Sequence, residues 1–161
     1  MATIYLALGS NVGDSATHIQ QAIQLLSATL SSVKQAPVYA SKAMGYTDQA
    51  DFLNTAISGQ TTLPPQELLV VIKDIEKKIG RIERFRWGPR EIDIDLILYD
   101  DLIQDTDQLT LPHPHFRERD FVLQPLVDLK PSLTDPSTGK TMRQLLNDLP
   151  KDQISLIKVV D

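Results

Sequence analysis

Residues 92–98 alternate in a way that constrains the fold more than any other segment. In an extended strand, successive side chains point to opposite faces of the sheet. The even-numbered positions, which we expect to line a core, are Ile92, Ile94, Leu96 and Leu98. Asp93 and Asp95 then share the other face, with their Cα atoms about 7 Å apart. Two carboxylates at that spacing can hold one divalent cation, or a pair of them, between their tips.

A cluster of basic residues comes directly before the two aspartates. Residues 77–90 hold six Lys and Arg against one acid, although the net charge of the chain is −5. Arginines beside carboxylates that can bind Mg²⁺ favour a polyphosphate ligand, because the cation bridges some phosphate oxygens while planar guanidinium groups bind others. The alternative is a solvated strand face preceded by a basic helix end, and we accept it for Lys77 and Lys78.

The composition narrows the class of protein. A chain of 161 residues is expected to form one domain, residues 1–161. The absence of cysteine excludes disulfides and thiolate chemistry, which fits a reducing compartment. No segment is typical of a signal peptide or a membrane span, so we expect a cytoplasmic protein. The acidic balance argues against general affinity for nucleic acids.

The remaining periodicities predict the order strand, helix, strand, strand, helix, strand. The predicted strands cover residues 3–8, 36–41, 52–61 and 92–98, and a long loop is expected at 42–51. An antiparallel sheet with helices packed on one face buries the apolar stripes economically. We therefore expect the ferredoxin-like βαββαβ arrangement of the α+β class. C-terminal extensions follow, namely a small hairpin after Tyr99, a helix at 121–129, a short helix capped by Thr141 and a strand at 154–160.

Three further side chains have more than one interpretation. Asn54 lies in a predicted strand, where asparagine is uncommon, and its amide could bind the edge of an amide-like heterocycle or pair with a neighbouring strand. Trp87 could act as a lid, stack on a base or simply pack. His113 and His115 lack a suitable third ligand for zinc, so we expect His113 either to bind a phosphate or sugar or to be a satisfied loop histidine.

The chain resembles the 6-hydroxymethyl-7,8-dihydropterin pyrophosphokinase family over about residues 2–135. The motifs that carry the resemblance are, in order, Leu8-Gly9-Ser10-Asn11, Phe52-Leu53-Asn54, Arg86-Trp87-Gly88-Pro89-Arg90, Ile92-Asp93-Ile94-Asp95, Leu109-Thr110-Leu111-Pro112-His113 and Arg119-Asp120-Phe121. The resemblance implies transfer of pyrophosphate from ATP to the hydroxymethyl oxygen of the pterin, with release of AMP, in folate biosynthesis.

The resemblance also implies roles for individual residues. Asp93 and Asp95 would hold two Mg²⁺ ions, while Arg81 and Arg90 would steady the phosphates during transfer. The residues implied to contact the pterin are Ser41, Met44, Phe52, Asn54 and Phe121. Those implied to surround ATP are Glu76, Trp87, Arg90, Thr110, His113 and Arg119. The loops at 42–51 and 81–90 are expected to close over both substrates, and the chain is expected to act as a monomer on small molecules.

Two other functions stay open, and one of them, an RNA-binding module, has the same order of elements. An RNA-binding module needs exposed aromatic side chains and a basic sheet face, whereas paired aspartates are expected here. A metal-dependent phosphohydrolase would hydrolyse ATP without the pterin. The segment between Arg81 and Trp87 is one residue shorter than in some family members and carries Glu83 where a basic residue is frequent, so Arg84 and Arg86 are weaker candidates for ATP binding than the residues named above.

Overall fold

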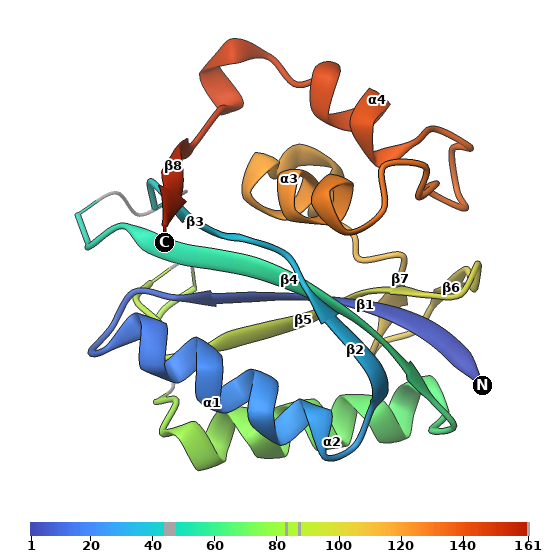
Figure 1. Ribbon diagram of the computed structural model, residues 1–161, viewed down its shortest axis with the longest axis horizontal. Coiled ribbons are helices and arrows are strands. Elements are labelled where there is room, and N and C mark those ends of the chain that lie inside the picture. The colour runs from blue at the N-terminus through green and yellow to red at the C-terminus, as the bar shows by residue number, and fades with distance from the viewer. Residues whose placement is uncertain (44–47, 83, 87, 161) are drawn as a thin grey trace.

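An antiparallel sheet forms the centre of the molecule (Figure 1). The computed structural model describes residues 1–43, 48–82, 84–86 and 88–160. Within this part of the chain the sheet has six strands, in the order β5-β1-β4-β3-β8, and β2 pairs with β4 beside β3. The strands are β1 (Ala2–Ser10), β2 (Ser31–Gln35), β3 (Val38–Ser41), β4 (Phe52–Thr61), β5 (Asp93–Tyr99) and β8 (Leu156–Val160).

Helices α1 (Ser15–Ser27) and α2 (Pro65–Ile79) cover one face of the sheet (Figure 1). The Asp14 side chain caps α1 by accepting from the amide of Thr17, and Gly80 ends α2 in the left-handed conformation. Apolar residues of the helices and of β1, β4 and β5 form the core between the two layers, among them Ile4, Leu6, Ile19, Leu26, Ile57, Leu68, Ile72 and Ile94. These elements confirm the predicted α+β fold.

The opposite face is covered only in part, by α3 (Asp120–Leu129) and α4 (Met142–Asn147). A second core lies beneath them, with Phe116, Leu123, Leu126 and Met142 packed against sheet residues such as Tyr5 and Ile97. The hairpin of β6 (Gln104–Asp105) and β7 (Thr110–Leu111) and two short helices, η1 (Phe116–Glu118) and η2 (Lys151–Gln153), complete the extensions. The part of this face that α3 leaves uncovered is where a ligand can reach the sheet.

The second predicted strand, 36–41, is wrong in its start and its continuity. Strand pairing with β4 begins at Ser31 and is divided into β2 and β3 at Ala36 and Pro37. Proline has no amide hydrogen and interrupts a ladder of backbone hydrogen bonds. At the break, the hydroxyl of Thr55 donates to the carbonyls of Ala36 and Pro37 in place of a backbone amide.

The alternation predicted for residues 92–98 holds only as far as Leu96. Leu6 pairs with Leu96 and Tyr5 with Leu98, so Ile97 is an extra residue opposite β1. Such a bulge shifts the alternation by one position. The alternation predicts that Leu98 packs with Ile94 and Leu96 in the first core. Leu98 packs in the second core instead.

None of the helices in the described part of the chain combines the length and the apolarity needed to cross a membrane.

Candidate active site

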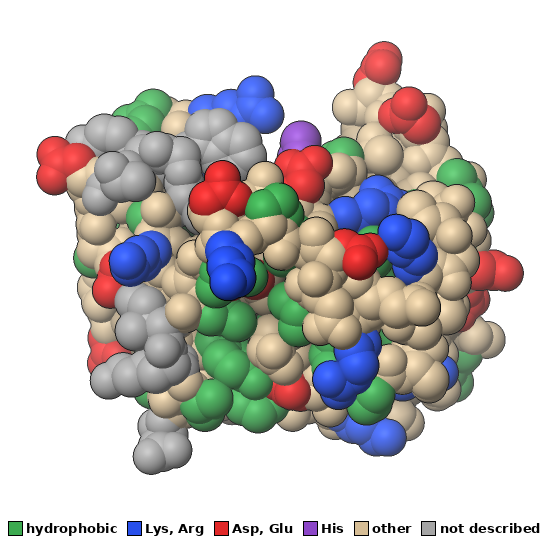
Figure 2. All heavy atoms as spheres, turned by 90° about the horizontal axis from the view of Figure 1, so that it is seen from above, with side chains coloured by type: hydrophobic (Ala, Val, Ile, Leu, Met, Phe, Trp, Pro, Cys, Tyr) green, Lys and Arg blue, Asp and Glu red, His purple; other side chains and the backbone are tan. Residues whose placement is uncertain are grey.

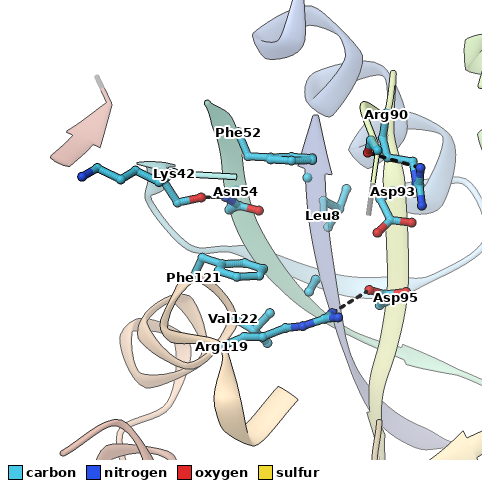
Figure 3. A pocket seen from close by; sticks show the side chains of 14 residues that line it. Leu8, Lys42, Phe52, Asn54, Arg90, Asp93, Asp95, Arg119, Phe121 and Val122 are labelled. Atoms are coloured by element: carbon cyan, nitrogen blue, oxygen red, sulfur yellow. Dashed lines mark hydrogen bonds and ion pairs between the residues drawn. The ribbon is translucent and has the colours of Figure 1, made fainter. Parts of the chain in front are cut away.

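A pocket opens on the sheet face that α3 leaves uncovered (Figure 3). Its floor comes from small residues of β1, chiefly Ala7 and Gly9. One side is formed by Asp93 and Asp95 of β5 and by Arg90. The other sides come from β4, from the end of β3 and from the start of α3, and include Ser41, Lys42, Phe52, Asn54, Arg119 and Phe121. Segments far apart in the sequence thus meet in one concave site.

Asp93 and Asp95 lie on the same face of β5 and both line the pocket, as the alternation predicts. Their side chains are 36% and 28% exposed. Burial against the sheet, together with the negative charge of Asp93, raises the pKa of Asp95 to about 7. Two carboxylates that repel each other at neutral pH form a site where a bound cation would be stabilised.

These residues fit Mg²⁺ in the form in which it accompanies a nucleotide. Among the described residues, no group of three or more His, Cys, Asp or Glu side chains is arranged to hold a metal ion. Mg²⁺ is commonly bound by one or two carboxylates, with water and substrate phosphates supplying the other ligands. A pair of aspartates facing an open pocket therefore suits Mg²⁺ that arrives with a polyphosphate.

Three arginines surround the aspartates. Arg81 Nη1 lies 3.6 Å from Asp93 Oδ1, and Arg119 Nη1 lies 3.9 Å from Asp95 Oδ2. Arg90 donates to the carbonyls of Phe85 and Gly88 at 3.3 and 3.2 Å, which folds its side chain back along its own loop. The guanidinium groups of Arg81 and Arg119 therefore lie beside the carboxylates, where an anionic ligand bound to the aspartates through a cation would meet positive charge.

An aromatic slot occupies the end of the pocket away from the aspartates. Phe52 of β4 and Phe121 of α3 lie on either side of it, and Asn54 lies at its end (Figure 3). The Nδ2 of Asn54 donates to the hydroxyl of Ser41 at 2.5 Å, which leaves the amide oxygen as an acceptor. A Cβ on Gly9 would lie 2.9 Å from that oxygen. The slot therefore suits a flat heterocycle with a polar edge.

A second pocket lies along the outer edge of β5. Its lining includes Lys73 of α2, Thr110 and His113, and it shares Asp95 with the first pocket. Burial and the neighbouring Arg119 lower the pKa of His113 to about 4, so its ring is neutral at pH 7. The shared aspartate marks the place where ligands in the two pockets would meet.

Comparison with known proteins decides the family. A family model described as 7,8-dihydro-6-hydroxymethylpterin-pyrophosphokinase (HPPK) matches residues 5–131. The chain belongs to the HPPK family. A 2-amino-4-hydroxy-6-hydroxymethyldihydropteridine pyrophosphokinase of Aquifex aeolicus is 48% identical over 144 residues, which cover 89% of this chain and 90% of the relative. The enzyme of the same name from Methylorubrum extorquens is 40% identical over 160 residues, 98% of this chain and all of the relative.

Solved HPPK domains share the fold. A crystal structure of Plasmodium falciparum HPPK-DHPS matches with a TM-score of 0.74 at 16% identity, and the match covers 91% of this chain and 43% of that longer chain. Such low identity shows the fold alone. The resemblance stated from the sequence motifs is confirmed, and so is the activity that the family name carries, a pyrophosphokinase step of folate biosynthesis with ATP as co-substrate.

The structure brings most of the residues implied by HPPK membership to the two pockets. Ser41, Phe52, Asn54 and Phe121 line the aromatic slot, whereas Thr110 and His113 line the second pocket. Met44 and Trp87 lie outside the described residues. The individual roles of all these side chains stay predictions.

Glu76 does not line either pocket. It is only 2% exposed, and its Oε2 accepts from the amide of Ile94 at 2.9 Å and from Arg81 Nη1 at the same distance. Its Oε1 accepts no hydrogen bond from the described residues, although Lys73 Nζ lies 3.4 Å away. Glu76 thus ties α2 to the start of β5 and orients Arg81 toward Asp93, while one buried oxygen retains acceptor capacity.

Sequence reasoning missed Asn11, whose contacts are the most extensive of the turn after β1. Its amide group bonds to Gln49, to Ala50 and to the backbone of Arg90. The turn Gly9-Ser10-Asn11 alone was a weak signal, because these partners are 38 to 79 residues away. Lys73 was also missed, and its helical position gave no sign that it faces the edge of β5.

Proposed function

We propose that this chain transfers pyrophosphate from ATP to the hydroxymethyl oxygen of 6-hydroxymethyl-7,8-dihydropterin and releases AMP, in a reaction that depends on two Mg²⁺ ions held by Asp93 and Asp95. The observation that carries the proposal is that Asp95 lines both pockets. One pocket suits a flat heterocycle, and the other lies beside carboxylate, histidine and lysine groups. A phosphate chain that joins them must pass the aspartates.

The aromatic slot would hold the pterin between Phe52 and Phe121. Since Ser41 takes one amide hydrogen of Asn54, the carbonyl oxygen of that amide is directed to accept from the amino or ring N–H groups of the pterin. This arrangement would fix the orientation of the ring and turn its hydroxymethyl group toward Asp93 and Asp95. Positioning of this kind can supply a large part of the rate enhancement in a two-substrate transfer.

Phosphoryl-type transfer requires charge neutralisation and alignment more than a strong base. When bound, Mg²⁺ would supply Lewis acidity and bring the attacking oxygen and the phosphates together. Arg81 and Arg119, which flank the aspartates at 3.6 and 3.9 Å, would bind phosphate oxygens that carry charge during transfer. Arg90 would also bind phosphate oxygens once its side chain leaves the carbonyls of Phe85 and Gly88. We propose that Arg81 and Arg90 are the catalytic arginines.

Thr110, His113 and Glu76 are proposed to contribute to the nucleotide site. His113 is neutral at pH 7, so it can donate or accept a hydrogen bond without adding charge. Lys42, Gly88 and Arg90 line the pocket, and the loops to which they belong, at 42–51 and 81–90, would exclude water from the transfer. A cytoplasmic monomer that acts on these two small molecules, without nucleic acid or membrane partners, completes the proposal.

The RNA-binding alternative finds no support in the surface. On the face seen in Figure 2, Lys and Arg side chains are interspersed with Asp and Glu side chains and do not form one basic area. The sheet face that an RNA-binding module would expose carries α3 and the two aspartates instead.

The decisive experiment is a product assay with ATP, Mg²⁺ and the hydroxymethyldihydropterin. We expect AMP to appear only when the pterin is present, in amounts equal to the pterin diphosphate formed. Release of ADP or phosphate from ATP alone would favour a phosphohydrolase and contradict the proposal. Omission of Mg²⁺ with a chelator should abolish the AMP signal.

A further inference from the structure

The carboxylate of Asp120, the first residue of α3, is completely buried and connects that helix to the C-terminal strand. Its Oδ2 accepts from the amides of Ser155 and Leu156 at 2.7 and 2.9 Å, and its Oδ1 accepts from the Ser155 hydroxyl at 2.5 Å. Three donors from one short segment thus converge on one carboxylate. Hydrogen bonds to a charged group are among the stronger ones in proteins.

The same segment is also fixed to the opposite wall of the pocket. The carbonyl of Ser155 accepts from the amide of Lys42 at 2.8 Å, and β8 pairs with β3 up to Ser41 (Figure 1). Ser41 in turn accepts from Asn54. Ser155 therefore contacts α3 through its amide and hydroxyl and the end of β3 through its carbonyl.

The residues on either side of this connection belong to the pterin slot. Arg119 and Phe121, the neighbours of Asp120 in the chain, line one side of the pocket, and Ser41 and Lys42 line the other. Figure 3 shows Phe121 across the slot from Phe52, on an element separate from the strands. The distance between helix and sheet at this point sets the width of the slot.

We propose that Asp120 and Ser155 are a positioning pair that sets the width of the pterin slot, so that the C-terminal strand, β8, acts as a brace for substrate recognition. The proposal rests on the proposed function, because it takes the slot to be the pterin site. Neither side chain is required to touch the substrate. Their effect passes through Phe121 on one side and through Ser41 and Asn54 on the other.

A carboxylate is the group best suited to this brace. Two amide hydrogens and one hydroxyl hydrogen need an acceptor with several lone pairs, and an ionised carboxylate has only acceptor sites. An asparagine at position 120 could accept from the two amides with its oxygen and donate its NH₂ group to the Ser155 hydroxyl, but it would lack the negative charge that strengthens all three hydrogen bonds. The segment around Ser155 would then be held less tightly, and so would the end of β3 that it contacts.

The test compares substrate affinities in Asp120→Asn and Ser155→Ala. Pterin affinity is measured in the presence of Mg²⁺ and saturating α,β-methylene-ATP, whose bridging carbon prevents transfer, and the affinity for the analogue is measured separately. We expect pterin affinity to fall about tenfold in Asp120→Asn, because misplacement of a binding group by less than 1 Å is costly. Ser155→Ala should show a smaller loss, and the affinity for the analogue should change less than about twofold in either variant.

Asp135→Asn provides the matched control. Asp135 is another fully buried carboxylate of the C-terminal extension, and it accepts from Arg117, Thr138 and the amide of Ser137 without contacting β3. The Asp135→Asn variant should lose about as much stability as Asp120→Asn does, but it should keep wild-type pterin affinity.

Three results would overturn the inference. They are wild-type pterin affinity in a folded Asp120→Asn, an equal loss in Asp135→Asn, and, if Asp120→Asn does not fold, wild-type affinity in Ser155→Ala. Failure of the proposed function would be distinct, because the wild-type chain itself would then not bind the pterin.

Discussion

The side chain of Asn11 accepts a hydrogen bond from the backbone amide of Arg90 at 2.8 Å, and the carbonyl of Arg90 accepts from the amide of Asn11 at 3.0 Å. The other end of the Asn11 amide donates to Gln49 and to the carbonyl of Ala50, at 2.8 and 2.9 Å. One residue in the turn after β1 therefore holds the ends of both loops beside the pocket. These bonds give the ends of the two loops a common anchor.

Asn11→Ala should remove the anchor that the ends of the two loops share. Loss of the amide group removes three hydrogen bonds, and we expect kcat/KM for AMP formation to fall by about ten- to a hundredfold. The free energy of unfolding should fall by only about 1–2 kcal/mol. Steady-state kinetics and chemical denaturation test the two effects separately. Asn147→Ala, at the exposed end of α4, is the control and should change neither kcat/KM nor the free energy of unfolding. Wild-type kinetics in Asn11→Ala would contradict a role of this anchor in the reaction.

Asp95→Asn should abolish transfer. The substitution keeps the shape of the side chain but removes the negative charge that would hold Mg²⁺, so we expect AMP formation to fall by about a thousandfold or more. Asp101→Asn, in the exposed turn after β5, should retain wild-type turnover. Calorimetric titration with Mg²⁺ and α,β-methylene-ATP gives a second readout. Undiminished turnover or Mg²⁺ binding in Asp95→Asn would contradict the assignment of this carboxylate.

The same substitution should stabilise the free protein in a pH-dependent way. Burial and Asp93 raise the pKa of Asp95 to about 7, above its ordinary value of 3.8. The folded state therefore holds the Asp95 proton more tightly than the unfolded state does, and this contribution to stability is lost as the pH rises through about 7. Asp95→Asn avoids the loss and should be more stable than wild type at pH 8, by about 1 kcal/mol after solvent screening.

Thermal unfolding in the presence of a chelator measures this effect at pH 8 and pH 5. A gain of about 3 °C in Tm is expected at pH 8, and the difference should shrink toward pH 5, where wild-type Asp95 is protonated. Asp101→Asn again serves as the control. A lower Tm for Asp95→Asn than for wild type at pH 8 would show that the ionised Asp95 carboxylate does not destabilise the free protein.

The first hundred residues illustrate what periodicity can predict. Alternation and helical spacing identified β1, α1, β4, α2 and β5, because each buries a stripe on one face. The bulge at Ile97 could not be predicted, since Ile97 and Leu98 are both apolar and a shift within an apolar run changes nothing in the pattern. The apolar stripes of α3 and α4 did not specify which sheet face they cover, because packing partners are set in three dimensions.

The residues of the site also divide into those that the sequence predicts and those that it does not. Asp93 and Asp95 were predictable because strand geometry places alternate residues together, and the aromatic and amide residues followed from the family motifs. Asn11 and the pair Asp120 and Ser155 were not, because their partners are distant in sequence and hydrogen bonds of this kind leave no local periodicity. Residues that position a site are therefore harder to predict than residues that line it.

Gly9→Ala should narrow the pterin slot from its floor. The added Cβ would lie 2.9 Å from Asn54 Oδ1 and 3.6 Å from the Phe52 ring, and Asn54 cannot move freely because its amide donates to Ser41. We expect pterin affinity, measured with saturating α,β-methylene-ATP, to fall about tenfold. The affinity for the analogue itself, measured separately, should stay within about twofold of wild type. Gly59→Ala places its Cβ against Leu30 on the other face of the sheet, at 3.2 Å, and controls for the general effect of alanine in a strand. Equal losses of pterin affinity in the two variants would show that the floor does not shape the slot, whereas a loss confined to Gly9→Ala would assign the close approach of β1 to substrate recognition.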